Sequence, residues 1–310
     1  MADNLKGKIK EYGLGTKTSY DGHRTLNKDG TFNVTKTNRP FLERFNFFHS
    51  LISMPWWRFF VIILIGYFVI NIFFAGLYVW IGVENLTGIN SSDNAKAFLE
   101  AFFFSAQTVT TLGYGRVAPI GVTANIVAAI ESMLGLLSFA LATGMVYGRF
   151  SKPRPKIKYS SHAVVAPFKA INGFMFKIVN PHENQLLDVE ANLTLSMKKD
   201  DSGARDFYQL ELQIPKVIFF PYMWTIVHPI EETSPLFNLD EACVLEKDAE
   251  FIVSIKAFDE SFSQHIYSRS SYKASEIKWG EKFVYTVKSE NGGMIVDVGR
   301  LDETEKINLN

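Results

Sequence analysis

Two long apolar segments dominate the first half of the 310-residue chain and predict two membrane-spanning helices. Residues 59–81 form an unbroken apolar run in which Asn71 is the only strongly polar side chain, and residues 121–148 form the second run. At 1.5 Å per residue these runs are roughly 34 and 42 Å long, enough to cross a hydrocarbon core of about 30 Å. Residues 97–109, between them, are too few to span and favour a re-entrant helix.

The residues before the first span divide into a polar arm and a short amphipathic helix. Residues 1–44 are rich in Gly, Lys, Asn and Thr, and we interpret them as a cytoplasmic N-terminal arm. In residues 45–55, apolar side chains recur at helical spacing until Pro55 ends the pattern. Trp56, Trp57 and Arg58 follow, which is typical of a helix at the membrane–water interface. A buried helix of the soluble part is the alternative.

The composition changes after Pro153 and Pro155, and we predict that residues 151–310, which begin just before these prolines, form a separate domain. Short runs of Val, Ile, Phe and Tyr alternate there with turn residues, which predicts an all-β sandwich. The strands that we predict are 174–179, 191–197, 224–227, 251–257 and 283–287. Residues 199–203 read as a hairpin tip. No comparably strong helical periodicity occurs in this part of the sequence.

Charge is balanced, and its placement predicts topology. Lys+Arg and Asp+Glu number 32 each, so the net charge indicates no partner such as nucleic acid. The single Cys243 excludes an intrachain disulfide and suits a reducing cytosol. The cations that flank the two spans are Arg58, Arg149, Lys152, Arg154 and Lys156. The positive-inside rule then places both termini in the cytoplasm. These cations serve topology alone or also bind anionic lipid headgroups.

The segment between the re-entrant helix and the second span, residues 110–115, carries the candidate chemistry. Its sequence, Thr-Thr-Leu-Gly-Tyr-Gly, fits a K⁺ selectivity filter in which backbone carbonyls replace the hydration shell of the ion. Glycine at alternate positions permits backbone conformations that a Cβ atom penalises. We expect the carbonyls of Thr111, Leu112, Gly113 and Tyr114 to bind K⁺, with the Thr111 hydroxyl below them and the Tyr114 ring packed outward. An ordinary loop is the alternative.

Three residues of the second span are candidates for a structural or functional role. Glu131 is the one carboxylate inside the span and either acts in function directly or pairs behind residues 110–115, the role we favour. Gly135 permits either bending or close helix packing. Gly144 is a candidate hinge for the same span.

Several motifs in order give the chain a resemblance to a known family. They are 54–59 (MPWWRF), 108–115 (TVTTLGYG), 140–144 (ALATG), 149–153 (RFSKP), 161–164 (SHAV), 228–236 (HPIEETSPL), 262–264 (FSQ) and 269–272 (RSSY). With them the chain resembles inward-rectifier potassium channels, and among these the prokaryotic KirBac group. The resemblance implies a homotetramer of the plasma membrane, here a bacterial inner membrane, with an immunoglobulin-like cytoplasmic domain on each subunit. It also implies that K⁺ is the permeant ion and that no cofactor is needed.

The resemblance also implies where conduction is controlled. Tyr147 matches the bulky residue that narrows the bundle crossing in prokaryotic members, although packing against a neighbouring helix is the alternative. Phe258, Asp259 and Glu260 match a second, cytoplasmic constriction. Arg149, Lys152, Arg154 and Lys156 lie where members bind anionic phospholipid, whose sign of regulation stays open. Mg²⁺, polyamines and Ba²⁺ are the blockers that the family implies.

Departures from the family pattern occur at three places. Phe139 stands where strongly rectifying members carry an acidic residue, so strong rectification from the cavity is not expected, and attraction of blockers from below by Glu260 is the alternative. Gln107 and Val117 replace a charged pair behind the filter. Arg116 stands at the outer mouth, where prokaryotic members usually have aspartate, and a ring of arginines there would repel entering cations.

Three other readings stay open or are disfavoured. A channel-like protein that no longer conducts is kept open by Arg116 and Gln107. A two-span ligand-gated channel is disfavoured because the sequence after Pro155 has no Gly-rich phosphate loop and no EF-hand spacing. A membrane-tethered enzyme is disfavoured because the six histidines are scattered and a Gly-x-Ser-x-Gly nucleophile turn is missing.

Overall fold

The computed structural model describes residues 8–9, 24–35, 37, 47–89, 93–151, 157–199, 204–220, 223–290 and 293–310. The chain divides into two compact units, one of residues 38–152 and one of residues 1–37 together with 153–310. Several predictions lie outside the described residues: most of the arm 1–44, the first residues of the interfacial helix, the hairpin tip at 200–203, and Lys152, Arg154 and Lys156.

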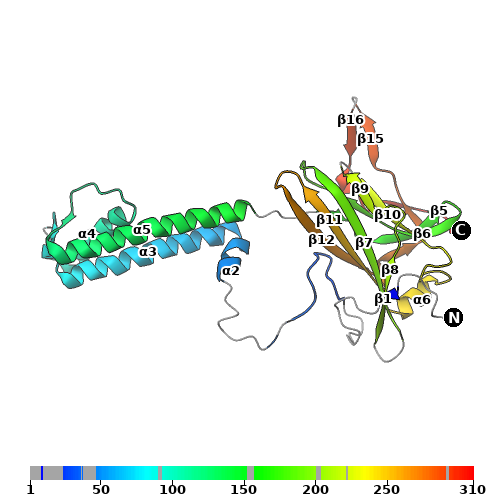
Figure 1. Ribbon diagram of the computed structural model, residues 1–310, viewed down its shortest axis with the longest axis horizontal. Coiled ribbons are helices and arrows are strands. Elements are labelled where there is room, and N and C mark those ends of the chain that lie inside the picture. Colours follow the sequence, from blue (N-terminus) through cyan, green and yellow to red (C-terminus); the bar gives the residue numbers. More distant parts are fainter. Residues whose placement is uncertain are drawn as a thin grey trace. The chain divides into compact units, whose positions relative to one another are not determined.

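The unit of residues 38–152 is helical. Its elements are α2 (Phe47–Ser53), α3 (Trp56–Ile81), η1 (Val83–Asn85), β2 (Leu86–Thr87), α4 (Asn94–Val109), β3 (Ala118–Pro119) and α5 (Gly121–Phe150) (Figure 1). α3 and α5 are long and apolar enough to cross a membrane. α4 lies between them in sequence and packs against both. This order of elements is that of the predicted spans and re-entrant helix.

All three long helices extend beyond their predicted bounds, for local reasons. α3 begins at Trp56 because Pro55, with φ of −55°, ends the preceding turn and leads directly into the helix. α4 begins at Asn94, earlier than the predicted start near Ala97, because the Asp93 carboxylate accepts a hydrogen bond from the Ala95 N–H at 3.0 Å. α5 continues through Phe150, two residues past its predicted end.

Apolar side chains hold the helical unit together where α4 meets α3. Phe74, Ala75 and Tyr78 of α3 are buried against Ala101 and Phe104 of α4. The Tyr78 and Phe104 rings meet edge to face with centroids 5.1 Å apart. The re-entrant helix is therefore anchored on the first span, and its C-terminal end is positioned by that contact.

The other unit is a β-sandwich, as predicted. One sheet has the order β1-β8-β7-β11-β12, with β9 also pairing with β7, and the other has the order β10-β6-β5-β13, with β4 also pairing with β6. The strands are β1 (Lys8–Ile9), β4 (Lys158–Tyr159), β5 (Ala163–Phe168), β6 (Ile171–Val179), β7 (Leu186–Lys198), β8 (Arg205–Leu210), β9 (Lys216–Phe219), β10 (Met223–Pro229), β11 (Glu250–Asp259), β12 (Gln264–Lys273) and β13 (Ile277–Trp279). Phe174 of β6 stacks on Phe251 of β11 at 4.1 Å, which joins the two sheets through the core.

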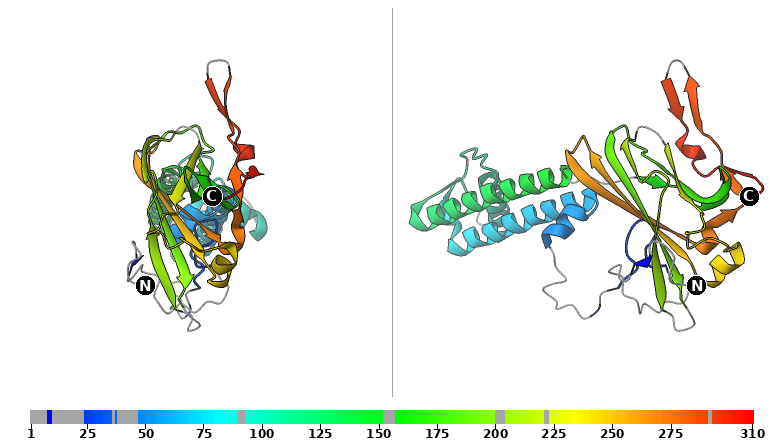
Figure 2. Two further views of the ribbon diagram at one scale, coloured as in Figure 1. Left: turned by 90° about the vertical axis from the view of Figure 1, so that its right-hand side faces the viewer. Right: turned by 45° about the vertical axis from the view of Figure 1, so that its right-hand side comes forward.

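One local prediction in this unit is wrong, and one short element was not predicted. Residues 283–287 are not one strand, because β14 (Glu281–Phe283) pairs with β17 (Thr304–Lys306), whereas β15 (Val287–Glu290) pairs with β16 (Gly293–Val296). The chain must leave one pairing before it enters the next, and the β15–β16 hairpin projects from the sandwich (Figure 2). A short helix, α6 (Glu241–Glu246), was not predicted; the Asp240 side chain caps it at the Cys243 N–H.

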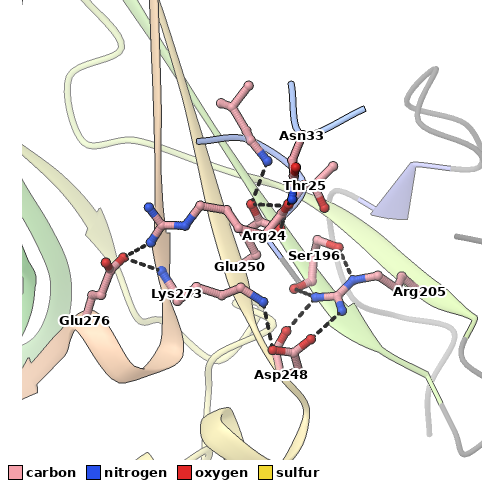
Figure 3. A network of polar contacts seen from close by, with 10 residues as sticks. Arg24, Thr25, Asn33, Ser196, Arg205, Asp248, Glu250, Lys273 and Glu276 are labelled. Carbon is pink, nitrogen blue, oxygen red and sulfur yellow. Dashed lines mark hydrogen bonds and ion pairs between the residues drawn. The ribbon is translucent and has the colours of Figure 1, made fainter. Parts of the chain in front are cut away.

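The N-terminal segment, residues 24–33, binds to the β-sandwich through a buried carboxylate (Figure 3). Glu250 of β11 accepts hydrogen bonds from the Thr25 N–H at 3.0 Å and from the Leu26 N–H at 3.1 Å. The Leu26 side chain is fully buried. Arg24 forms an ion pair with Glu276 next to this contact. A segment far away in sequence thus becomes part of the same unit.

A second polar cluster lies beside it (Figure 3). Asp248 accepts from Arg205 Nη1 and from Lys273 Nζ, both at 2.9 Å. Arg205, which is almost fully buried, also donates through Nε to the Ser196 hydroxyl at 2.8 Å. One carboxylate therefore satisfies two cations that the fold withdraws from water.

We expect this unit to lose stability in acid. Burial alone would raise the pKa of Asp248 and of Glu276, but hydrogen bonds from Lys273 and from the neighbouring cations outweigh burial and hold both pKa values below the ordinary 3.8 and 4.5. A carboxyl whose pKa is lowered by folding stabilises the fold above its ordinary pKa, and that stability is lost as the pH falls through the folded pKa. Thermal unfolding of the full-length protein, from neutral pH to below 3.8, measures this loss of stability as a fall in Tm. A Tm that does not depend on pH would contradict the expectation.

Candidate functional site

The chain folds back on α4 at the point where the predicted filter begins. The carbonyl oxygen of Gln107 accepts hydrogen bonds from the Leu112 N–H at 2.9 Å and from the Gly113 N–H at 3.3 Å. The Thr111 N–H bonds to the Thr108 carbonyl at 3.0 Å. The first residues after the helix are therefore fixed by its last carbonyls, and residues 110–115 start from a defined position.

Backbone conformation alternates along the filter segment. Thr111, Gly113 and Gly115 have φ of 58°, 52° and 81°, whereas Leu112 and Tyr114 between them do not have positive φ. Left-handed conformation is strain-free for glycine, and at Thr111 it costs roughly 1–2 kcal/mol. Strain of this kind concentrates at functional sites. This alternation is consistent with the predicted filter, in which backbone carbonyls would replace the hydration shell of K⁺.

The side chains of residues 110–115 differ in their contacts within the chain. The Thr110 hydroxyl donates to the Ala106 carbonyl at 2.7 Å and is used inside the chain. Leu112 and Tyr114 are exposed, as are the other residues of 110–115. One copy of the chain does not enclose an ion at this segment. The outward packing of Tyr114 and the role of the Thr111 hydroxyl stay predictions.

A buried polar network lies behind the filter and joins three helices. The Tyr78 hydroxyl of α3 donates to Glu131 Oε2 of α5 at 2.6 Å, and Ser105 of α4 hydrogen-bonds to Glu131 Oε1. The Ser105 hydroxyl also lies 3.0 Å from Asn71 Oδ1. Asn71, Ser105 and Glu131 are all buried. This arrangement favours the pairing role of Glu131, although its partners are neutral groups.

Sequence reasoning missed Ser105 and Tyr78 as partners of Glu131. Asn71 and Tyr78 are seven residues apart, two helical turns, so both lie on one face of α3. That spacing was the available signal. Ser105 could not be assigned, because the rotation of the re-entrant helix about its axis depends on packing that the sequence pattern does not fix.

Gly135 allows α5 to touch the end of α4. A Cβ atom added at Gly135 would lie 2.3 Å from the Val109 carbonyl oxygen and 2.9 Å from the Val109 Cα. Of the two roles considered for Gly135, this contact favours close packing over bending. A Cβ at Gly144 would meet no described atom of the chain within 4 Å, so its hinge role stays a prediction.

The outer mouth contains a charge pair. Arg116 Nη2 lies 2.5 Å from Glu100 Oε2 of α4, and both side chains are partly exposed. The predicted repulsion from Arg116 is therefore reduced by a carboxylate that we did not assign from the sequence. Gln107 and Val117, which replace the charged pair of the family pattern, carry no charge.

Arg116→Asp is expected to raise single-channel current about twofold at low salt, since a unit charge about 10 Å from an ion in water changes its energy by a few tenths of a kcal/mol. The effect should disappear at high salt, where screening removes it. Arg116→Asn is the matched control and should give an intermediate current. Equal currents for all three proteins at low salt would contradict the prediction.

Arg149, which belongs to the predicted lipid-binding set, has partners within its own chain. Its guanidinium donates to the carbonyls of Leu51 and Met54, at the end of α2. It also lies 4.4 Å from the Trp56 ring centroid and 4.7 Å from that of Phe59. Only 7% of the Arg149 surface is exposed, so its guanidinium is largely enclosed by these partners, and its lipid-binding role stays a prediction. It joins α2 to the end of α5.

Arg149→Gln is expected to lower the stability of the assembled protein by about 1–3 kcal/mol per chain, because two carbonyls and two aromatic faces lose their cationic partner. Thermal unfolding of the full-length protein in detergent measures this loss. Arg58→Gln is the control, because Arg58 is exposed, with its guanidinium 5.1 Å from the Trp57 ring centroid, and should leave Tm unchanged. An equal Tm for wild type and Arg149→Gln would show that the contact is not stabilising.

The two other predicted site residues on α5, Tyr147 and Phe139, are exposed in the single chain. Tyr147 is 74% exposed and Phe139 is 73% exposed. Arg58, at the start of α3, is the exposed cation of the predicted lipid set within the part of the chain that the structure describes. Lys152, Arg154 and Lys156 lie outside that part.

The three residues of the predicted cytoplasmic constriction lie at the β11–β12 hairpin. Asp259 is buried and accepts hydrogen bonds from the Asn184 side chain at 2.8 Å and from the Ser261 N–H at 3.0 Å, so it stabilises the hairpin, and its role at a constriction stays a prediction. The Phe258 ring packs edge to face on His265. Glu260 is exposed at the tip and keeps its predicted role as a proposal.

Comparisons with known proteins point to one family. A family model described as inward rectifier potassium channel C-terminal domain matches residues 157–310, and one described as ion channel matches residues 62–152. The chain is 30% identical over 289 residues to inward rectifier potassium channel Kirbac3.1 of Paramagnetospirillum magnetotacticum, covering 90% of this chain and 95% of that protein.

Relatives from mammals match over a similar length. The chain is 26% identical to G protein-activated inward rectifier potassium channel 2 of Rattus norvegicus, over 91% of this chain and 72% of the relative. The Homo sapiens protein of the same name gives the same three values. A solved structure of the Pseudomonas fluorescens alkylpurine DNA glycosylase AlkC aligns with 60% of this chain and 50% of that one. The sequence identity is 9% and the TM-score is 0.21, which is too low to indicate a shared fold.

Proposed function

Since the chain belongs to the inward rectifier potassium channel family, an ion channel family and not a family of enzymes, we propose that four identical copies assemble around one pore that conducts K⁺ passively across a bacterial inner membrane. The observation that carries the proposal is the backbone alternation at Thr111, Gly113 and Gly115. It suits a ring of carbonyls that replaces the hydration shell of K⁺. The C-terminal end of α4, which carries partial negative charge, lies directly before this segment and favours a cation there.

The need for several copies is supported by what one copy leaves exposed. Residues 110–115 are open in the single chain, and α5 exposes Ile130, Met133, Leu137 and Leu141 along its length. A single filter strand supplies one carbonyl per level, whereas coordination of K⁺ needs a ring of them. A symmetric tetramer would bury these residues and close the ring.

We also propose where conduction is controlled. Tyr147, near the end of α5, would form the narrow ring at the bundle crossing, and Phe258 and Glu260 would surround a second constriction below it. Gly144, about one helical turn before Tyr147, would allow α5 to bend there. Phe139 leaves the cavity without a carboxylate, so Mg²⁺ and polyamines would block weakly, whereas Ba²⁺ would block at the filter.

The regulation that we propose is by anionic phospholipid at the membrane surface. Arg58 is the described candidate, and Lys152, Arg154 and Lys156 complete the set. This placement assumes that both termini are cytoplasmic, as the flanking cations predict. The sign of the lipid effect is decided by experiment.

Rubidium uptake into liposomes tests the proposal. Uptake that Ba²⁺ blocks and that K⁺, but not Na⁺, competes would support it, and varying the anionic lipid would give the regulatory sign. The second candidate, a channel-like protein that does not conduct, is favoured by Arg116 at the mouth. A verified tetramer without uptake in any lipid would support this second candidate. Recovery of uptake in Tyr147→Ala or Arg116→Asp would then identify the barrier.

A further inference from the structure

The polar network behind the filter has more contacts between oxygen atoms than its hydroxyl groups have protons. Three such contacts occur in a row: Tyr78 with Glu131, Glu131 with Ser105, and Ser105 with Asn71. The two hydroxyl groups, of Tyr78 and Ser105, supply one proton each. Two protons cannot satisfy three contacts, so a third proton must come from within the network.

The orientation of Asn71 decides where that proton is. Asn71 Nδ2 donates to the Tyr67 carbonyl oxygen at 2.7 Å, and a carbonyl oxygen can only accept. Asn71 therefore turns its own oxygen toward Ser105, and that oxygen also can only accept. The Ser105 proton is used in this contact, at 3.0 Å. The contact between Ser105 and Glu131 then needs a proton on the carboxyl.

We propose that Glu131 is held as an uncharged carboxylic acid that donates from Oε1 to Ser105 and accepts at Oε2 from Tyr78. The hydrogen bonds then run in one direction, from Tyr78 through Glu131 and Ser105 to Asn71 and the Tyr67 carbonyl. Every polar atom in the series has a partner, and no net charge is buried. An ionised Glu131 would leave Ser105 facing two acceptors with one proton.

The surroundings of Glu131 agree with the neutral form. Its side chain is fully buried between α3 and α4, and Tyr78 is the titratable group that faces it among the described residues. The ion pairs of the described residues do not include Glu131; the nearest pair in sequence, Arg116 with Glu100, lies at the partly exposed outer mouth. A cation that would stabilise the carboxylate form is therefore not in contact with it.

The acid acts as a positioning residue for the filter. Ser105 lies on the helix whose C-terminus fixes residues 110–115, and the proton on Glu131 joins that helix to both spans. Glu131→Gln supplies an N–H in place of the acid proton and should keep selective flux. Leucine has a similar size but no hydrogen-bond donor or acceptor, so we expect Glu131→Leu to reduce the flux at least about tenfold. The expected fluxes of these two variants rest on the proposed K⁺ conduction.

Infrared spectroscopy of the full-length tetramer tests the protonation state directly. In an ester-free detergent at neutral pH, wild type should show a carboxylic acid C=O band that shifts on deuterium exchange and is missing in Glu131→Gln. Tyr78→Phe should move this band to higher frequency, because the C=O loses its donor. Tyr78→Phe also assigns the band if Glu131→Gln does not assemble.

The outcomes separate this inference from the proposed function. Wild-type spectra without an acid band that depends on Glu131 or Tyr78 would overturn the inference, even if K⁺ flux is normal. A band that behaves as described in a tetramer without flux would support the inference and contradict the proposed conduction.

Discussion

Gly135→Ala is expected to reduce K⁺-selective flux by about tenfold or more, since overpacking costs roughly 1–3 kcal/mol at each site and every subunit carries the change. The added Cβ would lie 2.3 Å from the carbonyl oxygen of Val109 and 2.9 Å from its carbonyl carbon. These are backbone atoms of the last residue of α4, and they cannot rotate away as a side chain can. The displacement is passed directly to Thr110 and the filter. Rubidium uptake and K⁺/Na⁺ selectivity measure it.

Gly76→Ala is the matched control for this substitution. Gly76 lies in the other span, α3, is exposed in the single chain, and has no described atom within 4 Å of an added Cβ. The same chemical change should therefore leave flux near the wild-type value. Wild-type flux and selectivity in Gly135→Ala, with Gly76→Ala also unchanged, would show that α5 does not press on the end of α4.

Asp248→Ala is expected to destabilise the β-rich domain by about 3 kcal/mol, near the lower end of the effect of breaking a buried ion pair. The Arg205 side chain is 5% exposed and the Asp248 side chain 18%. Without the carboxylate, Arg205 stays buried with only the Ser196 hydroxyl, the Ser196 carbonyl and the residue 248 carbonyl as acceptors. Lys273 loses its ion pair as well. Chemical denaturation of the full-length protein in detergent measures this loss, and we expect a lower midpoint denaturant concentration for Asp248→Ala than for the wild type.

Asp188→Ala provides the comparison. Asp188 pairs with Lys216 at the same 2.9 Å, but both side chains are more than half exposed. Such surface pairs contribute about 0–1 kcal/mol. A midpoint for Asp248→Ala equal to that for Asp188→Ala would contradict the argument that burial decides the energy.

The architecture was predictable because its signals are local. Apolar runs of spanning length, the change to short alternating strands after Pro155, and the ordered motifs each come from neighbouring residues, and they led to the correct family and fold class. Glycines at 113 and 115 likewise indicated the alternating backbone that the structure has. The left-handed conformation of Thr111 was not predictable, because a threonine gives no such signal.

The sequence did not predict contacts that join distant residues. Arg149 was predicted as a cation at the membrane surface, and the carbonyls that bind it lie nearly one hundred residues earlier, at the end of α2. Asp259 was predicted at a constriction, and its hydrogen bond from Asn184 was not predicted. The strand predicted at 283–287 failed because its two ends pair with different partners. In each case tertiary packing decides the role of a residue that its neighbours leave open.

The reversal potential under bi-ionic conditions tests the central claim most directly. The purified wild-type protein is reconstituted in a planar bilayer with K⁺ on one side and an equal concentration of Na⁺ on the other. We predict a Ba²⁺-sensitive current that reverses far from zero, at a voltage that corresponds to preferential K⁺ permeation. A Ba²⁺-sensitive current that reverses at zero would contradict a selective filter at residues 110–115.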